Sequence, residues 1–400
     1  MVVASYRGAM RTITVEERRA RLGVRHLLAE RTRTVEEVAG ALVGLHASDP
    51  VSVYLSARAR LQAFAREDLD TALYDRRSLV RMLGMRRTMF VVPRDLAAIM
   101  DAACTKALAP AQRRRLIGML EDQGVTPDGA VWLRRVCTAT MRALRERGEA
   151  TATELVDAVP ELGLKLIFGE GKTWGGQVGV STRVLFLLAT EGRIVRGRPR
   201  GSWVSSQYRW TPTDTWLGAS LPTVPHAEAS AALLERWLRS FGPATITDIR
   251  WWTGWTQRQT SMALGEIDTE VVTLEDGARA NVLADDVDPV PAPAQWVALL
   301  PSLDATTMGW KQRGWYLGEH ASALFDRNGN AGPTVWADGR VIGGWGQSRD
   351  GSIAVALLER VDGVTAAGVR TEQRLLADWL GEARVIPRFR TPIDKDLTGG

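Results

Sequence analysis

A chain of 400 residues with a net charge of +5 is too long for one ordinary core and suggests several domains or modules. Four scattered histidines and two cysteines, Cys104 and Cys137, without a C-x-x-C pair, indicate neither a zinc site nor a disulfide framework, although an Asp/Glu magnesium site stays open. No apolar run is long enough to span a membrane and no secretory signal is recognised, so a cytoplasmic protein is expected.

Positive charge is concentrated in the first part of the chain. Residues 1–120 contain 21 Lys/Arg and 12 Asp/Glu, a net charge of +9. Arginine suits forked contacts to phosphates and base edges, so this part is the better candidate for binding a polyanion. A GC-rich genome produces the same arginine bias, and the charge alone does not establish nucleic-acid binding.

The first predicted module combines three helices with a hairpin. Helices are predicted over 16–29, after Thr34 and over 50–64, and Thr34 with Glu37 has the form of a capping box. The run SLVRMLGMRRTMFVVP, residues 78–93, is predicted to form the hairpin.

The same order of elements recurs twice. The second copy has helices over 128–147 and 178–192, the latter ending at Gly192, a short helix capped by Thr153, and two strands around the basic tip RGRPRG. The third copy has predicted helices over 227–241, 247–254 and 256–267, and strands around LEDGARANV. Three-helix units with a terminal hairpin are winged helices.

A Pro-rich break over 285–295 introduces a β-rich region. Short strands are predicted in WVALLPSLD, GPTVWADGRVIGGWGQ and GSIAVALLERV, followed by a helix over 371–381 and a final strand. The predicted fold class is therefore α+β, with three tandem winged-helix modules and a C-terminal β-barrel-like domain. The expected boundaries are 10–110, 111–222, 223–288 and 289–400.

The stretch GLHASDP, residues 44–50, places His46, Ser48 and Asp49 between two predicted helices. Asp49-Pro50 is a strong helix start, with aspartate as N-cap and proline at the first helical position. Asp49 is therefore better interpreted as a cap than as a catalyst, and Ser48 as an accessory cap by the same logic. His46 has no such local role, and the alternative to a functional imidazole is a satisfied buried histidine.

Four stretches together resemble one family over nearly the whole chain: LHASDP, RMLGMRRTMFVVP, LLPSLDATTMGWKQR and FDRNGNAGPTVWADGRVIGGW. They resemble the bacterial AlkZ-like winged-helix DNA glycosylases, some of which protect antibiotic producers from their own DNA-alkylating product. The resemblance implies a hydrolase of N-glycosyl bonds, acting in base excision repair or self-resistance on double-stranded DNA that carries alkylated bases, typically at guanine N7 or adenine N3. It implies no cofactor, no obligate protein partner and a place at the nucleoid.

The family carries Gln-x-Gln or Gln-x-Asp where this chain has His46-Ala47-Ser48. Alkylation at N7 already activates the base as a leaving group, so the enzyme has to aim a water at C1′ and stabilise a sugar with oxocarbenium character. We expect a neutral His46 as general base and Ser48 as the group that positions the water, with Asp49 as the alternative charge stabiliser. No lysine lies in the loop, so a monofunctional glycosylase is expected.

The first hairpin is the predicted DNA contact, because two cations stand there beside two apolar side chains that either wedge the minor groove or lie in the core. Asn328-Gly329 is also an ordinary turn dipeptide, and the cluster Trp251, Trp252 and Trp255 is interpreted as packing rather than as a base-stacking platform. The predicted DNA-binding residues are Arg86, Arg87, Thr88, Met89 and Phe90 on the hairpin, Arg198 and Arg200 on the second wing, and Lys311, Arg313, Arg327, Asn328 and Trp336 in the β-rich domain.

A rival hypothesis is a DNA-binding regulator or damage sensor, in which the substituted loop is what remains of a lost active site. Both hypotheses predict DNA binding, but only a glycosylase releases N7-alkylguanine. A symmetric transcription factor is disfavoured, because three unequal modules do not match a palindromic operator. Replacement of both glutamines favours a bulky natural adduct over a methyl group.

Overall fold

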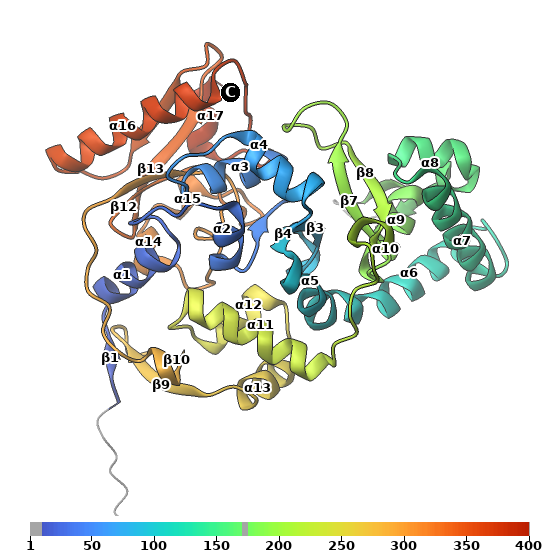
Figure 1. Cartoon of the computed structure of the whole chain (residues 1–400), viewed down its shortest axis with the longest axis horizontal. Helices are drawn as coiled ribbons and strands as arrows, with labels where there is room; N and C mark the ends of the chain where they lie inside the picture. The colour runs from blue at the N-terminus through green and yellow to red at the C-terminus, as the bar shows by residue number, and fades with distance from the viewer. Residues whose placement is uncertain (1–9, 170–174, 400) are drawn as a thin grey trace, which may run out of the picture. The chain divides into compact units, whose positions relative to one another are not determined.

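Helices and strands alternate along the computed structural model, which describes residues 10–169 and 175–399 (Figure 1). The chain forms two compact units: unit 1 comprises Met1–Leu69 with Ala231–Gly400, and unit 2 comprises Asp70–Ser230. The α+β class is confirmed. The four predicted modules do not coincide with these two units, because 10–110 and 223–288 each cross a unit boundary, and they stay a prediction.

Unit 2 combines helices with three antiparallel hairpins, β3–β4, β5–β6 and β7–β8. The first and third were predicted; β5–β6 was not, because both strands are short and β6 contains two glycines. The segment between β5 and β6 lies outside the described residues. The helices are α5 (Arg94–Met100), α6 (Ala109–Asp122), α7 (Gly129–Arg147), α8 (Ala152–Ala158), α9 (Val180–Thr190) and α10 (Thr213–Leu217); the strands are β3 (Leu79–Leu83), β4 (Met89–Pro93), β5 (Lys165–Phe168), β6 (Gly176–Gly179), β7 (Ile194–Pro199) and β8 (Tyr208–Pro212).

Side-chain caps set where the helices of unit 2 begin. Asp128 accepts a hydrogen bond from the Val131 amide and begins α7, as predicted. Helix α8 begins earlier than predicted, because Thr151 rather than Thr153 is its cap. The Thr151 hydroxyl accepts from the Glu154 amide, and the Glu154 carboxylate accepts from the Thr151 amide, which satisfies two amides that the helix itself leaves free.

Unit 1 is built from both ends of the chain. Its helices are α1 (Val15–Arg25), α2 (Val35–Ala41), α3 (Pro50–Arg58), α4 (Arg66–Asp70), α11 (His226–Phe241, from residue 231 onward), α12 (Ile246–Thr253), α13 (Gln257–Gly265), α14 (Gly314–Leu317), α15 (Ala321–Leu324), α16 (Gly363–Leu380) and α17 (Pro392–Thr398). Its strands are β1 (Thr12–Ile13), β2 (Leu45–His46), β9 (Thr269–Leu274), β10 (Arg279–Leu283), β11 (Val297–Leu300), β12 (Thr334–Ala337), β13 (Arg340–Gln347) and β14 (Ile353–Leu357). Strand β1 pairs in parallel with β9, so the start of the described chain joins the third predicted hairpin.

The C-terminal region is an antiparallel sheet in the order β11-β12-β13-β14, and the described strands do not close into a barrel. Two other expectations for this region are wrong. Helix α16 begins at Gly363 rather than Thr371, because Asp362 caps it through the Thr365 amide. The predicted final strand is instead helix α17, which begins at Pro392, where proline is favoured because its missing N–H is not needed.

Helix α17 lies beside the sheet (Figure 1). Close packing requires the glycines of the GGWG stretch in β13. A Cβ on Gly344 would lie 2.9 Å from the Ile393 side chain, and one on Gly346 would lie 2.9 Å from the Thr398 side chain, both on α17. A Cβ on Gly343 would lie 2.2 Å from the Ala356 carbonyl of β14. Helix α17 therefore packs directly on the backbone of β13.

A buried ion pair joins the two halves of unit 1. Both Arg60 and Asp304 are fully buried, and the guanidinium donates two hydrogen bonds, of 2.9 and 2.7 Å, to the carboxylate. Burial alone would raise the pKa of Asp304, but the charge of Arg60 and the hydrogen bonds to the carboxylate hold that pKa below its usual value. The Asp304 carboxylate also accepts from the Ser56 hydroxyl at 2.5 Å, and Arg60 donates to Thr306 Oγ1 at 2.8 Å.

This pair should be a large contributor to the stability of unit 1. Arg60→Met leaves the Asp304 carboxylate buried without its cation, and we expect a loss of about 3–5 kcal/mol, seen as a lower midpoint of thermal unfolding by circular dichroism. The matched control is Arg239→Met, which removes an exposed ion pair with Asp285 and should leave the midpoint unchanged. Equal midpoints in the two variants would contradict this expectation.

Candidate active site

The loop His46–Asp49 connects β2 to α3 and ends in a helix cap. The Asp49 backbone is extended, with φ −108° and ψ 121°, and its Oδ1 accepts from the Val51 amide at 3.2 Å. Pro50 occupies the first turn of α3. The interpretation of Asp49 as an N-cap is therefore confirmed, whereas no observation tests a catalytic role for it.

The second oxygen of Asp49 is held by a distant part of the chain. Oδ2 accepts from the backbone amide of Arg388 at 3.0 Å, and the Arg388 guanidinium donates to the Ser48 carbonyl at 3.2 Å. Asp49 is only 3% exposed, so burial raises its pKa, although the amides of Arg388 and Val51 oppose that shift. The last residue of the loop, Asp49, is thus held by α3 through the Val51 amide and by the C-terminal segment through the Arg388 amide.

His46 and Ser48 differ in their access to solvent. His46, on β2, is 6% exposed, whereas Ser48 is half-buried. The three predicted site residues are within four positions of one another, so the chain itself brings them together. Their proposed chemistry depends on a water reaching the imidazole and the hydroxyl.

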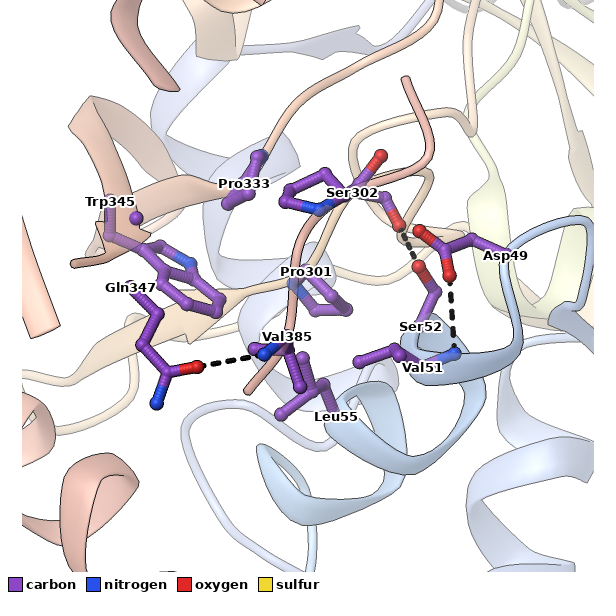
Figure 2. Close-up of a pocket in the computed structure, with 12 residues that line it drawn as sticks. Asp49, Val51, Ser52, Leu55, Pro301, Ser302, Pro333, Trp345, Gln347 and Val385 are labelled. Atoms are coloured by element: carbon purple, nitrogen blue, oxygen red, sulfur yellow. Dashed lines mark hydrogen bonds between the residues drawn. The ribbon is translucent and has the colours of Figure 1, made fainter. Parts of the chain in front are cut away.

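A small cavity lies against Asp49 and the first turns of α3. It leaves about 20 Å³ for the centre of a water molecule, enough to hold one. Figure 2 shows Asp49 and Ser52 together near one end of this cavity and Gln347 with Val385 at another. Its lining consists of Asp49, Val51, Ser52, Leu55, Pro301, Ser302, Pro333, Trp345, Gly346, Gln347, Val385 and Pro387.

Two buried polar side chains hold the cavity wall. Ser52 Oγ donates to the Ser302 carbonyl at 2.6 Å, which attaches α3 to the LLPSLD segment. The Gln347 amide donates to the carbonyls of Gly351 and Ala383, both at 3.1 Å, and its Oε1 accepts from the Val385 amide at 2.8 Å (Figure 2). Gln347 therefore fixes Val385, the first residue of the segment Val385–Arg388, whose last residue binds Asp49.

Sequence reasoning missed Arg388, Gln347 and Ser302. The hydrogen bond between Arg388 and Asp49 joins residues 339 positions apart, so no local pattern contains it. The available signal was the run VIPRFR, in which two arginines follow a proline.

The predicted DNA-contact hairpin of unit 2 presents some of its residues and buries others. Arg87 is exposed, and Arg86 and Thr88 are half-buried, with both arginines in the left-handed region at φ 52° and 63°. Met89 and Phe90 are 8% and 4% exposed, because β4 is buried along nearly its whole length. Of the two alternatives for Met89 and Phe90, a minor-groove wedge or a place in the core, their burial favours the core.

The basic wing of unit 2 also separates into two kinds of arginine. The Arg198 guanidinium lies 4.5 Å from the centre of the Tyr74 ring and pairs with Asp70 and Asp75 at 3.3 and 3.4 Å. Arg198 and Arg200 are both exposed. A phosphate at Arg198 would have to compete with two carboxylates, so Arg200 is the better candidate for a phosphate contact.

The predicted contacts in the β-rich region include one correction. Trp336 is fully buried and donates to Thr334 Oγ1 at 2.8 Å, so it is a core residue and not a DNA contact. Lys311, Arg327 and Asn328 are exposed.

Arg313 is half-buried and lies within 5.0 Å of the Trp251 and Phe325 ring centres. Trp252 and Trp255 are buried, which confirms their interpretation as packing residues. Asn328-Gly329 forms a turn, in which the Asn328 amide donates to Asp326 and Gly329 has φ +81°.

Two further features bear on function in residues 10–169 and 175–399. No group of three or more His, Cys, Asp or Glu side chains there is placed to hold a metal ion. Among those same residues, no helix is long and apolar enough to cross a membrane.

Comparison with known proteins gives a consistent assignment. The family model of DNA glycosylase AlkZ-like proteins matches residues 39–383, a range that includes the loop and Asp304 but ends before Arg388. The solved structure of the Streptomyces sahachiroi DNA glycosylase AlkZ is similar in fold, with a TM-score of 0.71, 22% sequence identity and coverage of 94% of this chain and 98% of that chain. No curated protein matches the sequence. The chain therefore belongs to the AlkZ-like DNA glycosylase family, a family of DNA repair enzymes that hydrolyse N-glycosyl bonds.

Proposed function

We propose that this chain is a monofunctional glycosylase that excises N7-alkylated guanine from duplex DNA, with His46–Asp49 as its active-site loop. The observation that carries the proposal is the place of this loop in an AlkZ-like chain: it ends at the N-cap of α3, beside a cavity with room for one water. A bulky natural product is the proposed source of the adduct, since the loop lacks both family glutamines.

The proposed chemistry needs one base and one oriented water. N7-alkylguanine leaves as a neutral base, so the remaining work is to bring a water to C1′ as the bond to the sugar breaks. Neutral His46 accepts the proton of that water, and the Ser48 hydroxyl holds its oxygen. A protonated imidazole would repel the cationic sugar, so excision should fall at acidic pH.

Asp49 is proposed to hold the loop rather than to react. Both of its oxygens accept backbone amides, from Val51 and from Arg388. Those two hydrogen bonds fix the direction in which the chain enters α3, and with it the place of Ser48. A carboxylate at this position also adds negative charge near the cationic transition state, which a charge-neutral substitution can test separately.

DNA is proposed to be held by cations that make phosphate contacts without reading the sequence. The hairpin β7–β8, which follows helices in unit 2, supports a proposed winged-helix module, and Arg87 and Arg200 are exposed cations on the hairpins β3–β4 and β7–β8. Lys311 and Arg327 add exposed positive charge in unit 1. Such contacts release counterions, so binding weakens strongly with salt.

His46→Ala should lower the single-turnover excision rate of N7-methylguanine by about 10²- to 10⁴-fold, the usual contribution of a general base, while duplex affinity stays unchanged. Ser48→Ala should cost less, because a second water can replace the hydroxyl. The double variant His46→Gln with Ser48→Gln should retain activity on this small adduct. Full activity in His46→Ala would remove the imidazole from the mechanism, and a native protein that binds duplex DNA but releases no base would favour the damage-sensor hypothesis.

Two substitutions of Asp49 separate its cap from its charge. Asp49→Ala removes both hydrogen bonds and should cost about 1 kcal/mol of stability. Asp49→Asn keeps a good N-cap on α3 but loses the hydrogen bond from the Arg388 amide, because its NH2 group cannot accept, so it should cost less stability than Asp49→Ala. If Asp49 only holds the loop, Asp49→Asn should lose less single-turnover excision activity than Asp49→Ala. A large loss of activity in a stable Asp49→Asn variant would assign the charge-stabilising role to the carboxylate.

Arg87→Ala should weaken binding to damaged and undamaged duplexes equally and reduce the slope of log affinity against log salt by about one, as expected for a phosphate contact. Arg86→Ala should have the smaller effect of the two, because Arg86 is half-buried. Fluorescence anisotropy over a range of salt concentrations measures both slopes. Unchanged affinity and slope in both variants would place the DNA on a different face of unit 2.

A further inference from the structure

Ile386 is the most exposed of the large apolar side chains in the described part of the chain. It is 69% exposed and lies between two exposed arginines, Arg384 and Arg388. Single exposed apolar side chains are common and need no explanation by themselves. Ile386 differs from them because the backbone on both sides of it is tied to the candidate active site.

The two ties are hydrogen bonds to the cavity wall and to the loop. On one side, the buried Val385 donates its amide to Gln347 Oε1 at 2.8 Å. On the other, Arg388 donates its amide to Asp49 at 3.0 Å, and Pro387 lines the cavity beside Asp49. The backbone of Val385–Arg388 is therefore held at both ends while the side chain of Ile386 projects into solvent.

Glycosylases usually expose the damaged nucleotide by extruding it or distorting the base stack, and an apolar side chain can open that stack. Proteins that open a stack insert an apolar side chain between base steps and bind the neighbouring phosphates with cations. Met89 and Phe90, for which the sequence left a wedge or a core position open, are buried. Ile386 has the exposure that a wedge requires, and the Arg388 guanidinium, two residues along, lies at the Ser48 carbonyl.

We propose that Val385–Arg388 is a DNA-opening finger, in which Ile386 enters the base stack beside the damaged nucleotide and Arg388 binds a phosphate next to it. This inference rests on the proposed glycosylase function and names the element that gives the loop access to C1′. It also explains why Ile386 is exposed to solvent although the backbone of Val385 and Arg388 on either side of it is held by hydrogen bonds. The finger lies beyond residue 383, where the match to the family model ends.

The first test measures unstacking without catalysis. The probe is a duplex with 2′-fluoro-N7-methyldeoxyguanosine, whose glycosidic bond resists hydrolysis, next to 2-aminopurine, whose fluorescence rises when it unstacks. Binding of the native protein should raise the fluorescence several-fold, and Ile386→Ala should lose most of that rise at unchanged affinity. Ile386→Leu should restore it, and Val364→Ala, at a side chain that is 66% exposed on α16, should behave as the native protein.

The second test measures excision of N7-methylguanine in a single turnover. Ile386→Ala should be at least about tenfold slower than the native protein on a fully paired duplex, but within about twofold on a lesion in a bulge, where unstacking costs less. Equal losses on the two substrates, or no loss of fluorescence in the first test, would overturn the wedge. If the native protein releases no base from either substrate, the proposed function fails, whereas the fluorescence test still reports on the finger.

Arg388 is tested by Arg388→Gln, which keeps the backbone amide that holds Asp49. We expect weaker duplex binding and a salt slope reduced by about one, with the same change on damaged and undamaged DNA. The matched control is Arg370→Gln, which removes an exposed arginine of α16. Identical affinities and slopes for the two variants would overturn the phosphate contact.

Discussion

The buried pair of Arg60 and Asp304 is the constraint on which unit 1 depends. A guanidinium and a carboxylate without access to water are tolerated only when each satisfies the other, so the residues after α3 and the LLPSLD segment have to meet in one geometry. Neighbouring groups strengthen this requirement: Arg60 donates to the His26 carbonyl at 2.9 Å, and the His26 ring hydrogen-bonds to Thr306 at 2.8 Å. Burial lowers the pKa of His26 to about 3, so this ring stays neutral and adds no second positive charge beside Arg60.

The position of the candidate active-site loop follows from this pair. Ser56 donates to Asp304 from the same helix whose first turn is capped by Asp49. Helix α3 is therefore attached at its C-terminal half to the segment around Asp304 and through Ser52 to Ser302. Because α3 is fixed along its length, the loop at its N-terminus has little freedom, which suits chemistry in which a water has to be aimed.

Local patterns predicted local structure well. The capping box of Thr34 and Glu37, the Asp49-Pro50 helix start and the two hairpins around Gly84 and Gly201 all depend on residues a few positions apart, and all were confirmed. The errors concern where helices begin and one element's type. Thr151 rather than Thr153 caps α8, and Asp362 begins α16 before the predicted start at Thr371. The last element, which begins at Pro392, is a helix and not a strand.

The candidate site was only half visible in the sequence. His46, Ser48 and Asp49 are adjacent, so their spacing and the family resemblance were enough to select them. Arg388 binds Asp49, and Gln347 binds Val385 in the same segment, only after the chain has folded. Burial was also invisible: Trp336 and Phe90 have the composition of DNA contacts, but they pack in the interior.

The division of unit 1 between the two ends of the chain has a consequence for biosynthesis. The loop at residues 46–49 leaves the ribosome early, but Asp304 and Arg388 are made only after the whole of unit 2. Until then, the Asp49 carboxylate lacks one of its two amides and α3 lacks the segment on which it packs. A nascent chain therefore carries every residue of the loop before the hydrogen bond from Arg388 can hold Asp49, and the candidate site is complete only when synthesis has passed residue 388.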